Sequence, residues 1–519
     1  MIRRRLPLLL LVSLAFFCLA GQELVLRTDV HSVEVSIVAT DAKGKPAEGL
    51  RAADFRVFDN GKAQAIASFE KINSRAAPGQ VGLPPNTYSN RIGGEKKPQV
   101  LTMILLDANN TAYRLQSVML RAVEHILEQV QPEERVALYA FGSRFVTIHD
   151  FTSDAASLLA TLRKYHGEVP DFAWAVLDPD LGSNDLGHMP GMWERVTAGK
   201  AVDTFEALVA IANRVKGVPG RKNLVWISQG FPMTVGDPQP PRVASHAGDP
   251  ATQAMRSAWR TFGVELGRAV TALNNAGVAV YPIDARGLSR DPIVNDNIHT
   301  MVQVASATGG KAFHDRNDRE QGVRAALDDS REVYVLTYSP DNIAHDGAYH
   351  HIRLQSTRPG VRMRYRQGYF APNGEEAAVA TLAENLTHTL DSPLDVAEIG
   401  IQASSKVGSG GADDVNIAVQ VDLSDIGLAH DAARWKGALR LEAVQIGPLG
   451  EHYEGVTQAA QLDLLPETYR KTLAEGLKLE MKLQRNPAAT AVRVAVADET
   501  SGRTGSVTIP LPARPATTR

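Results

Sequence analysis

The stretch VLTMILLD, residues 100–107, constrains the fold of this 519-residue chain more than any other segment. It is a nearly continuous apolar run, which is typical of a strand covered on both faces in a parallel sheet. From Gln99 to about residue 340, helical patterns alternate with further apolar runs of this kind. This alternation predicts right-handed βαβ units and a central, doubly wound, mostly parallel sheet.

The N-terminus has the pattern of a secretory signal peptide. Residues 1–20 hold three arginines, an apolar run and small residues, and we expect cleavage after Ala20. A membrane anchor is the alternative, but the run is short and no later segment reaches the roughly 18 apolar residues of a spanning helix. We therefore expect an exported, periplasmic or extracellular protein with no transmembrane segment in the mature chain.

Composition excludes two classes of function. The only cysteine, Cys18, lies inside the leader, so the mature chain is expected to lack disulfides and thiol chemistry. Phe17 and Ala15 fit a lipoprotein cleavage box at this cysteine poorly. Without the leader's three arginines, 52 basic residues face 58 acidic ones, a formal charge of −6. No basic cluster indicates nucleic-acid binding.

The texture of the sequence also predicts how the chain is divided. Short alternating runs predict small β units at both ends, and Gly and Pro mark the connections. We expect a signal peptide at 1–20, a small N-terminal β domain at 22–73, a linker at 74–98, an α/β domain at 99–372, a helical connector at 373–392 and an antiparallel β-sandwich at 393–512.

Oxygen-bearing side chains follow the first apolar strand directly. Asp107, Asn109 and Thr111 stand at alternate positions where a helix is expected to begin. Open α/β sheets bind ligands beyond the carboxyl ends of their strands, and hard divalent ions take oxygen ligands. A metal site is one interpretation of the cluster; the other is that Asp107 and Asn109 cap the helix.

Other polar residues give weaker signals of a functional site. Adjacent His350 and His351 are expected on opposite faces of a strand, which argues against a shared metal site. No GxSxG, HExxH or phosphate-loop motif is present, so an enzyme is not expected.

Seven segments in order resemble a von Willebrand factor A domain: ILLDANNT, RVALYAFG, DTFEAL, GRKNLVWISQGF, GVAVYPIDARG, ASATGGKAF and YVLTYSP. More narrowly, the chain is similar to the bacterial VWFA-related family described from Acidobacteria. Members of that family also carry a leading segment like GLRAADFRVFDNGK and a closing one like RQGYFAP. The resemblance covers about residues 28–372.

The resemblance implies a metal site. The family uses an Asp-x-Ser-x-Ser run, a threonine from a later loop and an aspartate after the fourth strand. The matching residues here are Asp107, Asn109, Thr111, Thr204 and Gln229. Gln229 keeps an oxygen but lacks the charge, so affinity for Mg²⁺ (or Mn²⁺ or Ca²⁺) is expected to be reduced, and Gln229→Asp is expected to raise it.

The resemblance also implies a binding function. We expect an exported, non-enzymatic, adhesion-type protein that contacts protein partners through the loops around 107–111, 166–204 and 229–251. Two alternatives remain: a metal-assisted hydrolase that uses Asp107 at the same face, and a structural envelope component that has lost metal binding.

The leader gives the first prediction. N-terminal sequencing of the exported protein should find Gly21 or Gln22 as the first residue, because the basic, apolar and small-residue order ends at Ala20. An intact Met1 on a cytoplasmic protein would refute it.

Overall fold

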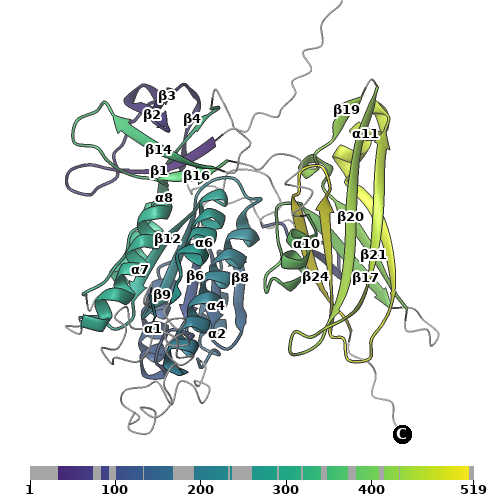
Figure 1. Cartoon of the computed structure of the whole chain (residues 1–519), viewed down its shortest axis with the longest axis horizontal. Helices are drawn as coiled ribbons and strands as arrows, with labels where there is room; N and C mark the ends of the chain where they lie inside the picture. Colours follow the sequence, from purple (N-terminus) through teal and green to yellow (C-terminus); the bar gives the residue numbers. More distant parts are fainter. Residues whose placement is uncertain are drawn as a thin grey trace, which may run out of the picture.

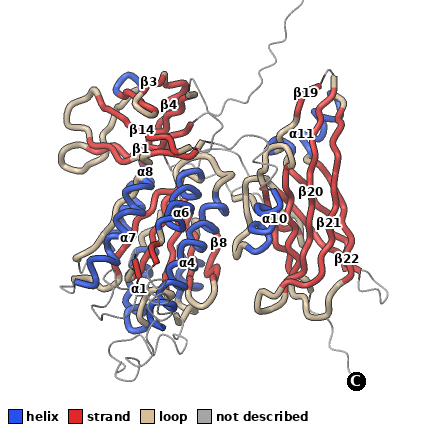
Figure 2. Tube along the Cα trace, in the orientation of Figure 1, coloured by secondary structure: helices blue, strands red, loops and turns tan. Residues whose placement is uncertain are grey.

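The computed structural model describes residues 33–73, 83–92, 101–131, 134–167, 192–231, 234–235, 260–288, 292–316, 320–340, 348–371, 382–407, 414–431 and 433–512. These residues form a mostly parallel α/β sheet with helices on both faces, together with several antiparallel sheets (Figures 1 and 2). The predicted leader and its cysteine lie outside the described residues.

Five strands form the central sheet in the order β12-β9-β6-β7-β8. All pairs are parallel except β7 with β8, which is antiparallel. Every residue of the four parallel strands is buried, as the apolar runs predict. The strands are β6 (Leu101–Asp107), β7 (Arg135–Phe141), β8 (Phe145–Thr152), β9 (Lys222–Ser228) and β12 (Val278–Asp284).

Two hydrophobic layers cover the sheet. One contains side chains of α4, α6 and α7, and the other contains side chains of α1, α2 and α8. The helices are α1 (Tyr113–Leu127), α2 (Ala155–Leu162), α4 (Met192–Val215), α6 (Gly263–Asn275), α7 (Pro292–Thr308) and α8 (Glu320–Arg331). A short antiparallel pair of strands, β10 (Thr234–Val235) with β11 (Arg260–Thr261), adds to this domain.

The N-terminal strands form a sandwich with strands that are almost 300 residues away. One sheet has the order β15-β1-β13-β4 and the other β16-β14-β2-β3 (Figure 1). They comprise β1 (Val33–Thr40), β2 (Phe55–Asp59), β3 (Lys62–Gln64), β4 (Ile66–Asn73), β13 (Glu332–Tyr338), β14 (Tyr349–Ser356), β15 (Arg362–Arg364) and β16 (Gly368–Phe370), with a 3₁₀ turn at Ala52–Asp54. Their apolar faces form one core.

This pairing differs from the expected boundaries at 22–73 and 99–372. Strand β13 lies between β1 and β4, not in the central sheet, so residues 332–370 complete the N-terminal sandwich. The physical reason is that an apolar run such as 332–338 can be buried equally well in the core of a sandwich and in a parallel sheet. The α/β domain is therefore an insertion between the two halves of a β domain.

The C-terminal region is a sandwich, as expected. Its sheets have the orders β22-β18-β17-β5 and β19-β20-β23-β24, with β21 also paired to β20. The elements are β17 (Ile401–Val407), β18 (Asp414–Val421), a 3₁₀ turn (Leu423–Asp425), β19 (Ala429–Asp431), β20 (Arg434–Ile446), β21 (His452–Leu464), α11 (Pro466–Glu475), β22 (Leu477–Gln484), β23 (Ala491–Asp498) and β24 (Thr504–Pro510). The expected connector contains α10 (Leu382–Asp391), which packs on β23 and β24.

The expected linker at 74–98 contributes a strand of its own. β5 (Thr87–Ser89) pairs with β17 and forms an edge strand of the C-terminal sandwich. Next to β5, the buried Asn90 side chain donates to the carbonyls of Val396 (2.7 Å) and Ile399 (2.8 Å) and accepts from the N–H of Ile401 (2.8 Å). The segment thus ties the C-terminal sandwich to the region that leads into β6.

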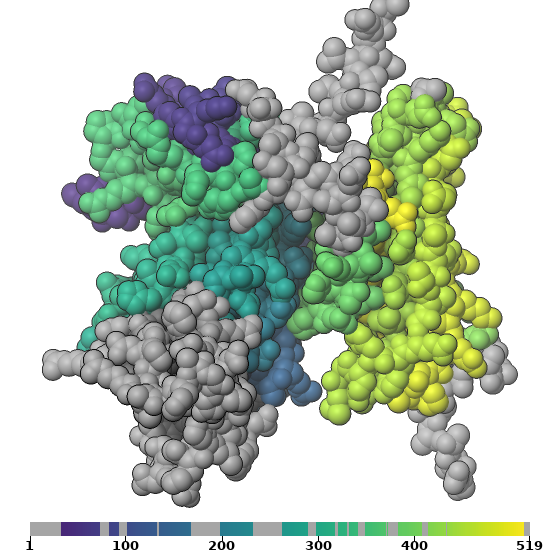
Figure 3. Space-filling view, in the orientation of Figure 1, coloured from purple at the N-terminus to yellow at the C-terminus, as the bar shows by residue number. Residues whose placement is uncertain are grey.

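The α/β domain contacts this segment and also the chain just before β17. Arg214, near the end of α4, donates to the carbonyl of Asn90 (2.6 Å), and Lys216 pairs with Glu398 (2.7 Å). In the space-filling view the C-terminal sandwich lies beside the α/β domain, with an open notch below their contact (Figure 3).

One local prediction is confirmed: His350 is buried and His351 exposed, as expected for neighbours on a strand. Asn60 and Gly61 have φ of 46° and 83° and form the turn between β2 and β3. The N-cap of α2 is Asp154, whose carboxylate accepts from the N–H groups of Ala156 and Ser157.

Asn90 gives a stability prediction. Asn90→Ala should lower the free energy of unfolding by about 3 kcal/mol or more, because each buried group left without its partner costs about 1–3 kcal/mol. Chemical denaturation of the mature chain is the measurement. The exposed Asn416 of β18 provides the control, and Asn416→Ala should change stability by less than about 0.5 kcal/mol. Equal effects from the two variants would contradict the role given to Asn90.

Candidate functional site

Three buried side chains meet at the carboxyl end of the parallel sheet. Asp107 is the last residue of β6, Ser228 is the last residue of β9, and Thr204 lies in α4; all three have 0% exposure. The parallel register pairs Leu106 with Ile227, so Asp107 and Ser228 end neighbouring strands side by side. Ligands bind at this edge in open α/β sheets.

Hydrogen-bond donors surround the Asp107 carboxylate. Its Oδ2 accepts from Ser228 Oγ (2.7 Å) and from the indole N–H of Trp226 (3.0 Å). Its Oδ1 accepts from the backbone N–H of Asn110 (3.0 Å), and the amide nitrogen of Asn110 contacts both carboxylate oxygens (3.2 and 2.9 Å). Burial raises the pKa of Asp107, and the hydrogen bonds from Asn110, Ser228 and Trp226 oppose that shift.

The amide of Asn110 also bridges Asp107 to Thr204. Asn110 Nδ2 lies 2.7 Å from Thr204 Oγ1, whose own proton goes to the carbonyl of Lys200 (2.7 Å). An ion shared by the carboxylate of Asp107 and the hydroxyl of Thr204 would have to lie where this amide nitrogen lies. The bridge therefore links the turn after β6 to α4 without a metal.

A half-buried lysine contributes positive charge. Burial lowers the pKa of Lys200 to about 7, while the negative charge of Asp107 acts to raise it. The lysine side chain therefore lies within electrostatic reach of the carboxylate. When protonated, it balances the charge of Asp107 from within the chain.

The remaining predicted residues have different surroundings. Gln229 Oε1 accepts from the backbone N–H of Ala112 (2.6 Å), the N-cap residue of α1. Asn109 Nδ2 donates to the carbonyl of Lys200 (3.2 Å) and lies 3.4 Å from Thr204 Oγ1. Thr111 Oγ1 is buried and has no hydrogen-bond partner within the described part of the chain. The five residues gather at one edge, but Gln229 stabilises the start of a helix.

Thr204 matches a threonine that the family takes from a loop, but here it lies inside a helix, because α4 begins at Met192. The alternative that Asp107 and Asn109 cap α1 is wrong, because Ala112 is the N-cap and the oxygen that meets its N–H comes from Gln229. Most of the predicted loops at 166–204 and 229–251 lies outside the described residues.

Sequence analysis missed four members of the network: Asn110, Lys200, Trp226 and Ser228. A signal existed for Ser228, because it ends the next buried apolar run, as Asp107 ends the first. Asn110 was passed over because the motif uses alternate positions, and its role depends on how the turn folds back. No pattern in the sequence identifies Lys200.

As arranged, these residues do not fit a divalent cation. One carboxylate is present, its oxygens already accept from neutral donors, and an amide nitrogen takes the position between Asp107 and Thr204. A hard cation requires lone pairs at such positions. Among the described residues, no three or more His, Cys, Asp or Glu side chains gather as metal ligands would.

Comparisons with known proteins give weak similarities only. No protein-family model matches the chain, and no curated protein matches its sequence. The narrower Acidobacteria-type assignment stays a prediction. Within the described residues, no helix is long and apolar enough to span a membrane.

Solved structures similar to this chain include three of bacterial proteins. A von Willebrand factor type A protein from Catenulispora acidiphila is 10% identical, with 66% of this chain and 84% of that one covered (TM-score 0.26). Three N-terminal domains of the type V pili tip protein Mfa5 from Porphyromonas gingivalis are 10% identical, with 89% and 79% covered (TM-score 0.25). An aerotolerance-related membrane protein from Bacteroides fragilis is 16% identical, with 44% and 98% covered (TM-score 0.26). At these scores the similarities carry no argument, and the fold rests on the topology above.

The bridge made by Asn110 predicts how the site responds to metal. The melting temperature of the wild-type chain should be the same in EDTA and in millimolar Mg²⁺ or Mn²⁺. Asn110→Ala should cost about 1–3 kcal/mol without metal, because a buried carboxylate loses donors. It should also leave room for an ion, which would restore part of the stability.

Gln229→Asp is the matched comparison. If the amide of Asn110 is the obstacle, this change alone should produce no metal response, because the side chain at 229 faces the start of α1. A metal-dependent rise in the melting temperature of the wild type, or of Gln229→Asp alone, would contradict this account and favour the metal site that the sequence predicts.

Proposed function

We propose that this chain is an exported, non-enzymatic binding protein that contacts a protein partner through the carboxyl-end face of a von Willebrand factor A-like domain. The observation that carries the proposal is Tyr113, which begins α1 directly beside the buried Asp107 network and is 48% exposed. Exposed aromatic side chains on a ligand-binding edge are typical anchors of protein interfaces.

The surroundings of Tyr113 support an interface. Arg114, the next residue, is exposed, as are Ser143 and Arg144 in the turn after β7. Leu288, four residues beyond the end of β12, is 67% exposed. Aromatic, apolar and arginine side chains at one edge of a sheet match the composition of interface cores.

The buried network beneath Tyr113 keeps this surface in one shape. Asp107 fixes the turn after β6 through Asn110, and Gln229 fixes the start of α1 through Ala112. A surface that is ordered before binding loses less entropy when it binds. In this proposal, partner binding needs no divalent ion, because Asn110 and Lys200 supply the donors and the positive charge.

Export rests on the leader at residues 1–20, which lies outside the described part of the chain. The proposal places the mature protein in the periplasm or outside the cell, where the lack of cysteine in residues 21–519 makes the fold independent of disulfide formation.

Truncation of Tyr113 tests the binding surface. Tyr113→Ala should weaken the saturable binding of the purified mature chain to the envelope fraction of the producing organism by about tenfold or more, since an anchor side chain is worth about 1.4 kcal/mol or more. The melting temperature should not change, because the side chain is half exposed. Leu449→Ala, at an 81% exposed position of the C-terminal sandwich, is the control and should bind like wild type.

Three results would count against the proposal. Equal binding by Tyr113→Ala and wild type would exclude this face as the interface. Turnover of ester, phosphate or peptide substrates that depends on metal and on Asp107 would favour the hydrolase. An absence of saturable binding by the wild type would favour a structural envelope component.

A further inference from the structure

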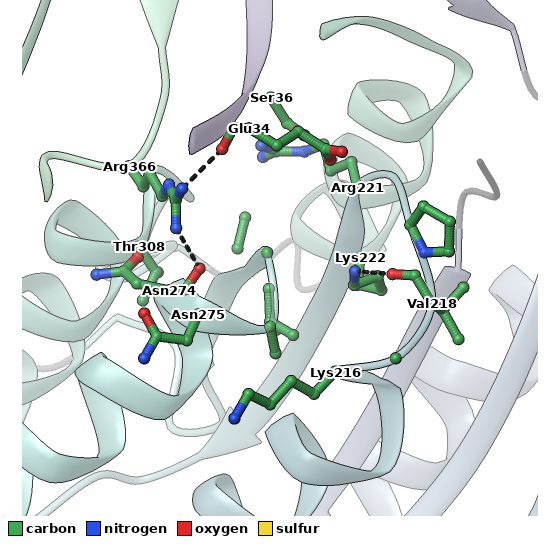
Figure 4. Close-up of a pocket in the computed structure, with 16 residues that line it drawn as sticks. Glu34, Ser36, Lys216, Val218, Arg221, Lys222, Asn274, Asn275, Thr308 and Arg366 are labelled. Carbon is green, nitrogen blue, oxygen red and sulfur yellow. Dashed lines mark hydrogen bonds between the residues drawn. The ribbon is translucent and has the colours of Figure 1, made fainter. Parts of the chain in front are cut away.

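A second site lies at the opposite edge of the central sheet, where β9 and β12 begin. A cavity of about 350 Å³ opens there between the α/β domain and the N-terminal sandwich (Figure 4). Its walls come from β1 of the sandwich, the segment 216–222 that leads into β9, the C-terminal end of α6, and Arg366. The cavity is therefore built from parts of the chain that meet only in the fold.

The walls of this cavity carry more positive than negative charge. Lys216, Arg221, Lys222 and Arg366 face a single carboxylate, that of Glu34. Lys216 already pairs with Glu398 (2.7 Å), and Arg221 donates to Asn223 (3.0 Å) and Tyr281 (2.8 Å). Lys222 and Arg366 form no ion pair with a carboxylate anywhere in the described part of the chain.

Lys222 is the more deeply buried of these two cations. It is 3% exposed, and its ammonium donates to the carbonyl of Val218. Burial lowers its pKa to about 8, the carboxylate of Glu34 acts in the opposite direction, and the charge of Arg366 lowers it further. An ammonium has three donors, and a buried cation without a counter-charge is costly.

Arg366 has a buried donor left over. Its two terminal nitrogens donate to the carbonyls of Asn274 and Glu34, each at 2.7 Å, as the dashed lines in Figure 4 show. Its Nε is buried and meets no acceptor among the described residues. Burial also lowers the pKa of this guanidinium. Most buried donors in folded proteins do have a partner, so this one calls for an explanation.

Helix capping explains only part of the arrangement. The carbonyls of Val218 and Asn274 lie near the C-terminal ends of α4 and α6, where cations are favourable. Each cation, however, makes those contacts with only some of its donors. The remaining donors and the excess positive charge are what an oxyanion would match, because charge-assisted hydrogen bonds to oxyanions are strong.

We propose that this cavity binds a small oxyanion, carrying a phosphate or carboxylate group, between Lys222 and Arg366. The anion contacts the α/β domain through Lys222 and the N-terminal sandwich through Arg366, so it holds the two together at their junction. This inference is independent of the partner surface at the other edge of the sheet.

Inorganic phosphate is the first probe. Isothermal titration and thermal unfolding of the full mature chain at pH 7 are compared in phosphate and in sodium chloride of equal ionic strength. Phosphate should bind saturably and raise the melting temperature above the chloride value. A parallel series with malonate distinguishes a phosphate site from a carboxylate site. The anion that binds with the higher affinity identifies the class of the natural ligand.

Lys222→Met tests the assignment of residues. Methionine is unbranched and uncharged, so this variant should keep the fold and lose the phosphate response. Lys478→Met removes an exposed lysine on the C-terminal sandwich and should respond like wild type. If Lys222→Met does not fold, Arg366→Lys keeps the positive charge but removes Nε, and it should weaken phosphate binding about tenfold.

The proposal is overturned if neither phosphate nor malonate stabilises the wild type more than chloride does. It is equally overturned if the folded Lys222→Met variant, or Arg366→Lys in its place, binds the anion as tightly as wild type. In either case the cations serve only the helix ends.

Discussion

The buried carboxylate of Asp107 is the interaction on which the carboxyl-end face depends. A carboxylate removed from water must receive hydrogen bonds from the protein, and here they come from β9 and from the turn after β6. The amide of Asn110 extends this network to Thr204 in α4. One charged group thus fixes the relative positions of two strands, a turn and a helix. The exposed start of α1 directly follows that turn, so its position depends on the same network.

The second constraint is that the domains are not contiguous in sequence. Strand β13 follows α8 without a gap and passes between β1 and β4, so the chain leaves the α/β domain directly into the N-terminal sandwich. On the other side of the α/β domain, the segment that contains β5 pairs with the C-terminal sandwich before the chain enters β6. Contacts that return to early strands in this way restrict how far the α/β domain can move relative to its neighbours.

Sequence reasoning succeeded where one local property decides the structure. The strands β6, β7, β9 and β12 were predictable because every position must be buried, and the turn at Asn60 because only a few residues accept its backbone angles. It failed where the position of a segment depends on which distant strands or side chains it pairs with. The run at 332–338 is equally apolar in either sheet, and the antiparallel edge strand β8 mixes polar and apolar residues. At the site, the convergence of Asp107 and Thr204 was predictable from the motif, whereas the bridging amide of Asn110 depends on the path of the turn.

The two ends of β9 show why a ligand is expected at one edge and not required at the other. The strand is buried along all seven residues, and a lysine contributes positive charge near each of its ends. Lys222 is its first residue, and Lys200 acts on Asp107, the carboxylate that accepts from Ser228 at the other end. Lys200 has the carboxylate of Asp107 within reach, so the charge at that edge is balanced inside the chain. Lys222 has the carboxylate of Glu34 within electrostatic reach, but also the guanidinium of Arg366, and two cations repel. Burial is costly for both lysines. At the junction with the N-terminal sandwich the single carboxylate of Glu34 faces several cations, so positive charge is in excess there, and an anion from outside the chain is what would neutralise it.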